Sequence, residues 1–223
     1  MAKYVDGDLL SGVSSAVLVG RDLVDVHCAG FADIEAKTPM AVDHIFRVFS
    51  NSKLVTSMAA LMLYEEGRFD FDDAIEEYLP QLGNRQVLRP NATDPDDREV
   101  AATSITIRHL MTHTSGLSYG LFDPNALITK LHADAGVHNP LTPLSGMINA
   151  LEGLPLVFHP GRGWEYSVAT DVLGRLVEVI SGMSLDAFFT ARIFEPLGMA
   201  DTGFSVRRKN MTDWPPTMPA PIS

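Results

Sequence analysis

Patterns typical of β-strands lie almost entirely before residue 50 of this 223-residue sequence, and helical patterns follow them. Apolar residues on both sides of Gly20-Arg21-Asp22 predict a β-hairpin over residues 13–30, and a third extended stretch is expected at residues 45–49. A few strands followed by helices are typical of an α+β layout. The sequence therefore predicts a short antiparallel sheet flanked by helices.

Apolar residues recur at helical spacing in much of the chain after residue 50. This periodicity predicts one long helix from about 53 to 66, ended by Gly67, and another from about 168 to 180. Shorter or irregular helices are expected in four further places: residues 72–78, the segment from Ile107 behind a Thr106 cap, residues 123–153, and the segment behind a Ser184 cap.

Proline and polar residues mark the remaining segments. Residues 83–104 contain Pro90, Pro95 and an acidic run, which predicts a surface loop. Residues 206–223 are rich in proline and lack apolar periodicity, so a disordered tail is expected there. We expect one domain over residues 1–205, with a helical subdomain at about 70–160.

The acidic composition limits the classes of partner. A formal net charge of −11 argues against nucleic acid or an anionic membrane surface, because both select basic patches. Cys28 is the single cysteine, so neither an intramolecular disulfide nor a cysteine-based zinc site is expected. The first residues lack a signal-peptide pattern and no apolar run has the length of a membrane helix, which predicts a cytoplasmic protein.

Ser50-Asn51-Ser52-Lys53 stands at the expected start of the first long helix. Residues three apart on a helical turn share a face, so the Lys53 ammonium can approach the Ser50 hydroxyl. Free backbone N–H groups at a helix start stabilise the negative charge that develops when a nucleophile attacks. The pattern fits an activated serine, but the tetrapeptide alone fits better a helix cap followed by a solvated lysine.

Trp164-Glu165-Tyr166-Ser167 directly precedes the second long helix. A tyrosine held near a lysine can act as a base if the cation lowers its pKa from the ordinary value of about 10. By itself, this segment is interpreted more simply as an aromatic residue that packs a loop onto the helix.

Gly116-Leu117-Ser118-Tyr119-Gly120 matches the Gly-x-Ser-x-Gly motif of another hydrolase class. That motif requires a strand before the serine and a helix directly after it. A helical segment is predicted before Ser118 instead, and Asp134 with His138 or His159 would complete a triad only on paper. Ser118 is therefore not the favoured nucleophile.

His109 and His113 are four residues apart on the helix expected from Ile107. Metal ligands use this spacing. No third ligand suggests itself, so capping or packing is favoured, and neither a metal ion nor an organic cofactor is expected.

Taken in order, several motifs resemble those of the serine β-lactamase and penicillin-binding-protein superfamily. The matching segments are residues 46–53 around the Ser-x-x-Lys pattern, residues 105–117, residues 164–167 leading into 171–175, and residues 194–199. The resemblance runs from about residue 12 to 205 and is nearest to the class C branch. It implies a β-lactamase/transpeptidase-like α+β fold, with residues 1–205 as a single catalytic domain.

Within the superfamily, the chain looks most like the family VIII carboxylesterases. Lactamases and D,D-peptidases usually carry Tyr-x-Asn, whose amide helps to hold the substrate amide, whereas this chain has Val168 at the Asn position. The departure favours esters over lactams or peptides. The resemblance thus implies a serine carboxylesterase for short-chain esters, in which the Gly-x-Ser-x-Gly around Ser118 is not catalytic.

The resemblance assigns a role to each residue of the candidate site. Ser50 would be the nucleophile that forms an acyl-enzyme, and its backbone N–H would be one oxyanion donor. Lys53 would lower the pKa of its neighbours and share the proton. Tyr166 would be the general base in acylation and would activate water in deacylation, although whether Lys53 or Tyr166 takes the serine proton stays open. The expected partner is a small-molecule ester.

The superfamily pattern continues with a Lys/His-Thr-Gly or Trp-Gly-Gly motif on a further strand, and neither motif occurs in this sequence. The resemblance therefore implies missing C-terminal strands and a missing second oxyanion donor, which is worth about a hundred- to a thousandfold in rate. Uncovered strand edges would favour a homo-oligomer. Two alternatives remain: a β-lactamase or D,D-peptidase-like hydrolase, and an inactive penicillin-binding-like fragment that acts by binding or assembly.

Overall fold

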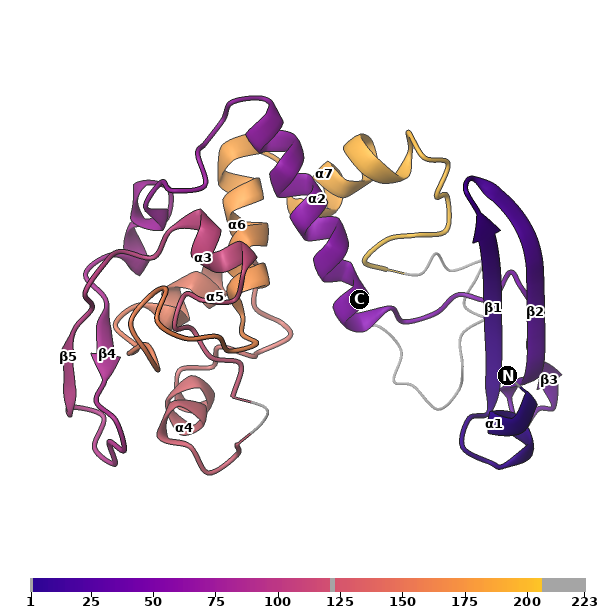
Figure 1. Ribbon diagram of the computed structural model, residues 1–223, viewed down its shortest axis with the longest axis horizontal. Helices are drawn as coiled ribbons and strands as arrows, with labels where there is room; N and C mark the ends of the chain where they lie inside the picture. The colour runs from indigo at the N-terminus through magenta and orange to yellow at the C-terminus, as the bar shows by residue number, and fades with distance from the viewer. Residues whose placement is uncertain (1, 121–122, 206–223) are drawn as a thin grey trace. The chain divides into compact units, whose positions relative to one another are not determined.

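The computed structural model describes residues 2–120 and 123–205 of the chain (Figure 1). They divide into two compact units: the described residues up to Val48 together with those from Ala200, and Phe49–Met199. The single domain expected over residues 1–205 stays a prediction, and the tail expected at 206–223 lies outside the described residues. No helix in the described ranges is long and apolar enough to cross a membrane.

The first unit is a small antiparallel sheet preceded by one helical turn. Its elements are α1 (Ala2–Asp6), β1 (Gly12–Val19), β2 (Asp22–Asp33) and β3 (Thr38–Pro39). The strands β1 and β2 pair along their length, and β3 pairs with β2. This pairing confirms the predicted hairpin, whose turn uses Gly20 at a φ of +63°, a conformation that glycine adopts without steric cost.

The extended stretch predicted at residues 45–49 is wrong. Residues 45–48 form no strand, and Phe49–Asn51 form a turn of 3₁₀ helix, η1. Phe49 has a φ of +44°, in the left-handed region, so the chain turns sharply just before Ser50. Apolar residues favour a strand only where a neighbouring strand pairs with them, and the strand that joins β2 lies earlier, at β3.

The second unit is mainly helical. Its elements after η1 are α2 (Ser52–Glu65), η2 (Ile75–Glu77), η3 (Pro80–Leu82), β4 (Gln86–Leu88), β5 (Arg98–Val100), α3 (Ile107–Met111), α4 (Leu127–Asp134), α5 (Leu144–Leu151), α6 (Ala169–Ser181), α7 (Leu185–Phe189) and the π-helix η4 (Thr190–Phe194). Both predicted long helices are confirmed as α2 and α6. The helix predicted at residues 72–78 is shortened to η2.

The surface loop predicted at residues 83–104 is wrong in part, because it contains the hairpin of β4 and β5. Val87 of β4 is buried, and the backbone of Leu156 bonds to both sides of it: Leu156 N–H donates to the Gln86 carbonyl at 2.7 Å and Leu88 N–H donates to the Leu156 carbonyl at 2.9 Å. The partner that orders β4 therefore lies almost seventy residues further along the chain, beyond the reach of a local sequence pattern.

Helices α2 and α6 pack against each other at the centre of the second unit (Figure 1). The buried residues of α2 are Thr56, Ala59, Ala60 and Leu63, and those of α6 include Val172, Leu173, Leu176 and Val177. Gly174 of α6 faces Thr56, and a Cβ there would lie only 3.0 Å from Leu185 Cδ2. Each large buried side chain stabilises the pair by about 1.5–3 kcal/mol. This packing holds the starts of both helices in place.

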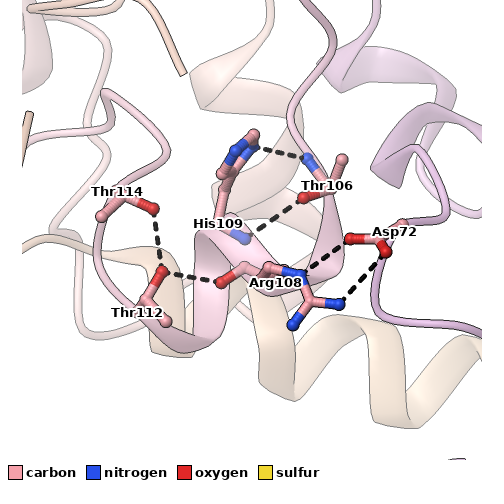
Figure 2. A network of polar contacts seen from close by, with 6 residues as sticks. All are labelled: Asp72, Thr106, Arg108, His109, Thr112 and Thr114. Carbon is pink, nitrogen blue, oxygen red and sulfur yellow. Dashed lines mark hydrogen bonds and ion pairs between the residues drawn. The ribbon is translucent and has the colours of Figure 1, made fainter. Parts of the chain in front are cut away.

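A capping box begins the short helix α3 (Figure 2). The Thr106 hydroxyl accepts the His109 N–H at 3.3 Å, and His109 Nδ1 accepts the Thr106 N–H at 3.1 Å. Arg108 donates Nε and Nη2 to the two carboxylate oxygens of Asp72, at 2.7 and 3.1 Å. Because that ion pair is exposed, it contributes at most about 1 kcal/mol to the stability of the fold.

The chain after α3 is fixed by two threonines (Figure 2). The Thr112 hydroxyl donates to the Arg108 carbonyl at 2.8 Å, and its oxygen lies 2.8 Å from the Thr114 hydroxyl. The residues before and after His113 are therefore hydrogen-bonded to each other through their side chains. His113 itself has a φ of +55°.

Candidate active site

Ser50 and Lys53 lie at the start of α2, on η1 and in the first helical turn. The Ser52 hydroxyl donates to the Phe49 carbonyl at 2.5 Å, which closes the turn. Phe49 is a bulky residue at a φ of +44°, and such strain persists only where the surroundings enforce it. The result is an exposed Ser50 hydroxyl beside a half-buried Lys53.

Tyr166 lies in the segment before α6, yet its phenol reaches α2. Its Oη is 2.7 Å from Ser50 Oγ, and either atom can be the donor. Lys53 Nζ lies 4.9 Å from the centroid of the Tyr166 ring. The structure thus brings together the three side chains named from the sequence, although Ser50 and Tyr166 are 116 residues apart.

The surroundings of Tyr166 lower the pKa of its phenol. Burial by itself would raise this pKa, but hydrogen bonds with Lys53 and Ser50, together with the Lys53 charge, outweigh burial. Asp171, in the first turn of α6, opposes this effect with its negative charge. The pKa of Asp171 is itself raised by burial. A lowered pKa makes the phenolate form of Tyr166 easier to reach, and a phenolate 2.7 Å from a serine hydroxyl can accept the serine proton.

Two aromatic side chains next to Tyr166 are not among the sequence-predicted site residues. The His113 imidazole stacks on Tyr166, with ring centroids 5.1 Å apart and planes 27° apart, and Trp164 meets the same imidazole edge-on at 6.3 Å. Tyr119 lies 5.7 Å from the Tyr166 ring, and Lys53 Nζ is 5.8 Å from the Tyr119 centroid. The sequence signal for Tyr119 is its place in the Gly-x-Ser-x-Gly motif, directly after Ser118.

Ser118 is buried and has a different set of contacts. Its hydroxyl donates to Glu165 Oε1 and accepts the Gly120 N–H at 3.2 Å. Residues 112–118 after α3 include no strand, so the strand and turn that a nucleophile of this motif requires are not formed there. His159, one partner considered for Ser118, is 3.0 Å from Glu99 instead. Ser118 connects the segment after α3 to the segment that carries Tyr166.

The described residues hold no group of three or more His, Cys, Asp or Glu side chains that could bind a metal ion. His109 uses Nδ1 in the capping box and His113 stacks on Tyr166, so the two histidines have separate surroundings. The backbone N–H of Ser50 lies at the start of α2, where N–H groups lack helical acceptors. Its use as an oxyanion donor stays a prediction.

Replacing Gly116 by Ala is expected to destabilise the second unit by about 3 kcal/mol. Gly116 has a φ of +82°, and a Cβ there would lie 2.1 Å from the Phe158 carbonyl oxygen. The left-handed conformation costs a non-glycine residue about 1–2 kcal/mol, and the overlap costs about 1–3 kcal/mol more. Urea unfolding gives the change, with Gly67→Ala as the matched control because Gly67 has a φ of +69° and open space around it. Equal losses in both variants would contradict the role of the close contact.

A family model described as Beta-lactamase matches residues 1–215. The chain belongs to the Beta-lactamase family. Among its relatives, esterase EstB of Burkholderia gladioli is 35% identical over 195 residues, which are 86% of this chain and 47% of EstB. The chain spans about half the length of the curated relatives it matches.

Solved structures share the fold. EstCE1, described as a hydrolase with promiscuous acyltransferase activity, has a TM-score of 0.80 at 27% identity, over 93% of this chain and 52% of that chain. Simvastatin synthase (LovD) from Aspergillus terreus, as the unliganded selenomethionyl derivative, has a TM-score of 0.78 at 29% identity, over 96% of this chain and 54% of that chain. The predicted β-lactamase/transpeptidase-like α+β fold is thereby confirmed, and so is the resemblance on which it rested.

Proposed function

We propose that this chain carries the acyl-enzyme machinery of a serine carboxylesterase that hydrolyses short-chain esters. The observation that supports it most directly is the 2.7 Å contact between Ser50 Oγ and Tyr166 Oη, beside Lys53. A serine alcohol is inert near neutral pH unless a base removes its proton, and Tyr166, with its lowered pKa, is in place to do so.

The reaction runs in two balanced steps. In acylation, Ser50 Oγ attacks the ester carbonyl carbon and gives its proton to the Tyr166–Lys53 pair; the bond from the carbonyl carbon to the alcohol oxygen breaks, and the alcohol leaves with that proton. In deacylation, Tyr166 takes a proton from water and the resulting hydroxide attacks the acyl carbon. The bond from that carbon to Ser50 Oγ then breaks, Ser50 Oγ receives the proton held by Tyr166, and the carboxylic acid leaves. The Ser50 backbone N–H stabilises the oxyanion in both steps.

Two observations support an ester rather than an amide as the substrate. Val168, at the position where lactamases carry an asparagine, is buried and has no polar group to hold a substrate amide. The named relatives include esterases from a bacterium and a fungus: EstB of Burkholderia gladioli and lovastatin esterase of Penicillium rubens. An alcohol is also a better leaving group than an amine, so the ester needs less help from the protein.

Treatment with a fluorophosphonate, followed by intact-mass spectrometry and peptide mapping, tests the proposal. One adduct on the peptide that contains Ser50, together with hydrolysis of a short p-nitrophenyl ester, is the expected result. Hydrolysis of a chromogenic cephalosporin at a comparable rate would favour a β-lactamase or D,D-peptidase-like enzyme instead. A folded chain that gives neither adduct nor turnover would leave the inactive, penicillin-binding-like fragment as the better description.

A further inference from the structure

We propose that His113 is a positioning residue for Tyr166, a role that rests on the proposed function of Tyr166 as the base. Residues 163–167 lie in neither helix nor strand, so regular backbone bonds do not fix the Tyr166 phenol. Proton transfer nevertheless requires that this oxygen stay within hydrogen-bond reach of Ser50 Oγ. Residues outside segment 163–167 must therefore hold the Tyr166 phenol in position.

His113 contacts the residues on both sides of Tyr166. Its backbone carbonyl accepts the Glu165 N–H at 3.0 Å. Its Nδ1 accepts the Ser167 N–H at 3.2 Å and lies 3.1 Å from the Ser167 hydroxyl. One residue thus fixes the backbone immediately before and immediately after Tyr166.

The His113 imidazole also contacts the Tyr166 ring directly. The two rings stack at 5.1 Å and 27°, so the imidazole restricts how far the phenol can swing. Since Nδ1 accepts an N–H, the neutral ring carries its proton on Nε2. Burial, and then the Lys53 charge, lower the pKa of His113, which favours this neutral form. The neutral imidazole can therefore hold the phenol without adding a positive charge beside it.

The residues on either side of His113 also make hydrogen bonds. The φ of His113, +55°, is rare for a residue with a side chain, and the Thr112 and Thr114 hydroxyls on either side of it are 2.8 Å apart (Figure 2). The Thr114 carbonyl in turn accepts the Gly161 N–H at 2.8 Å. The contacts of His113 with Glu165, Tyr166 and Ser167 therefore determine where the Tyr166 ring lies.

Steady-state kinetics with a short p-nitrophenyl ester test the role. His113→Ala is expected to lower kcat about 10- to 100-fold with KM changed less than about twofold, because a misplaced base slows the chemical step. His113→Asn is expected to recover kcat to within about fivefold of the wild type, because asparagine tolerates the left-handed backbone and offers an acceptor to Ser167. His109→Ala is the matched control: His109 also accepts a backbone N–H on Nδ1, but at Thr106.

The outcomes separate the inference from the proposed function. His109→Ala should lower the melting temperature and keep kcat, and an equal fall in kcat for the His109→Ala and His113→Ala variants would overturn the positioning role. So would a wild-type kcat in His113→Ala. If His113→Ala does not fold, His113→Phe, which keeps a ring but no acceptor, should lose kcat in the same way. Ester hydrolysis that survives Ser50→Ala would instead refute the proposed function itself.

Discussion

Replacing Ser50 by Ala is expected to lower kcat/KM for a short p-nitrophenyl ester by about 10⁴-fold or more and to abolish fluorophosphonate labelling. Removing the hydroxyl oxygen leaves no atom that can form the acyl-enzyme. Lys53 and Tyr166 act through that oxygen, so most of their contribution to the rate should be lost with it. Because the Ser50 side chain is exposed, the substitution should leave the free energy of unfolding within about 0.5 kcal/mol of the wild type. Labelling and urea unfolding on the same sample separate lost chemistry from lost fold.

Ser118→Ala provides the contrast, because Ser118 is the other serine in a hydrolase-like motif. Its hydroxyl is buried and donates to Glu165, so its loss should cost about 1 kcal/mol of stability and less than about tenfold in kcat/KM. Retained labelling at Ser50 is expected in this variant. Activity that disappears with Ser118 and survives without Ser50 would reverse the assignment.

Replacing Tyr166 by Phe is expected to lower kcat/KM by about 10²- to 10⁴-fold, the range for loss of a general base. The variant keeps the aromatic ring against His113, so the fold of the segment should persist. The phenol acts as a base only when deprotonated, so wild-type kcat/KM should rise as the pH rises through the pKa of Tyr166. That pKa lies below the ordinary value of about 10. Tyr166→Phe should lose this rise.

Tyr78→Phe is the matched control for the pH profile. The Tyr78 phenol donates to Asp73 at 2.8 Å, and its pKa is raised to about 12 by burial and by that carboxylate. The Tyr78 phenol therefore titrates at a higher pH than Tyr166, so Tyr78→Phe should keep the wild-type dependence of kcat/KM on pH. A profile that stays unchanged in Tyr166→Phe would show that another group is the base.

The parts of the fold that could be predicted are those set by local pattern. Helices α2 and α6 and the β1–β2 hairpin follow from apolar spacing and from turn residues within a few positions. The β4–β5 hairpin could not be predicted, because the backbone of Leu156 holds β4 in place from far along the chain. Phe49 adopts a positive φ, which a bulky side chain disfavours, so the sequence does not predict the turn at this position.

The candidate site also has a part that local sequence patterns predict and a part that they do not. Ser50 and Lys53 are three residues apart at a helix start, a relation that can be derived from spacing alone. Tyr166 could be joined to them only through the family resemblance, since no local rule connects positions 116 residues apart. His113 suggested a metal ligand or a packing residue by its spacing from His109. Its contact with Tyr166 depends on how the segment after α3 meets the segment before α6, and that is decided by tertiary packing.

The edge-on contact of Trp164 with His113 makes the indole an intrinsic optical reporter for this part of the molecule. Trp164 is 67% exposed and only two positions before Tyr166, so its emission is expected to respond to changes in solvent contact near Tyr166. The sequence has one other tryptophan, Trp214. With Trp214 replaced by Phe, stopped-flow fluorescence can follow the reaction of a fluorophosphonate with Ser50 in real time, without an attached dye.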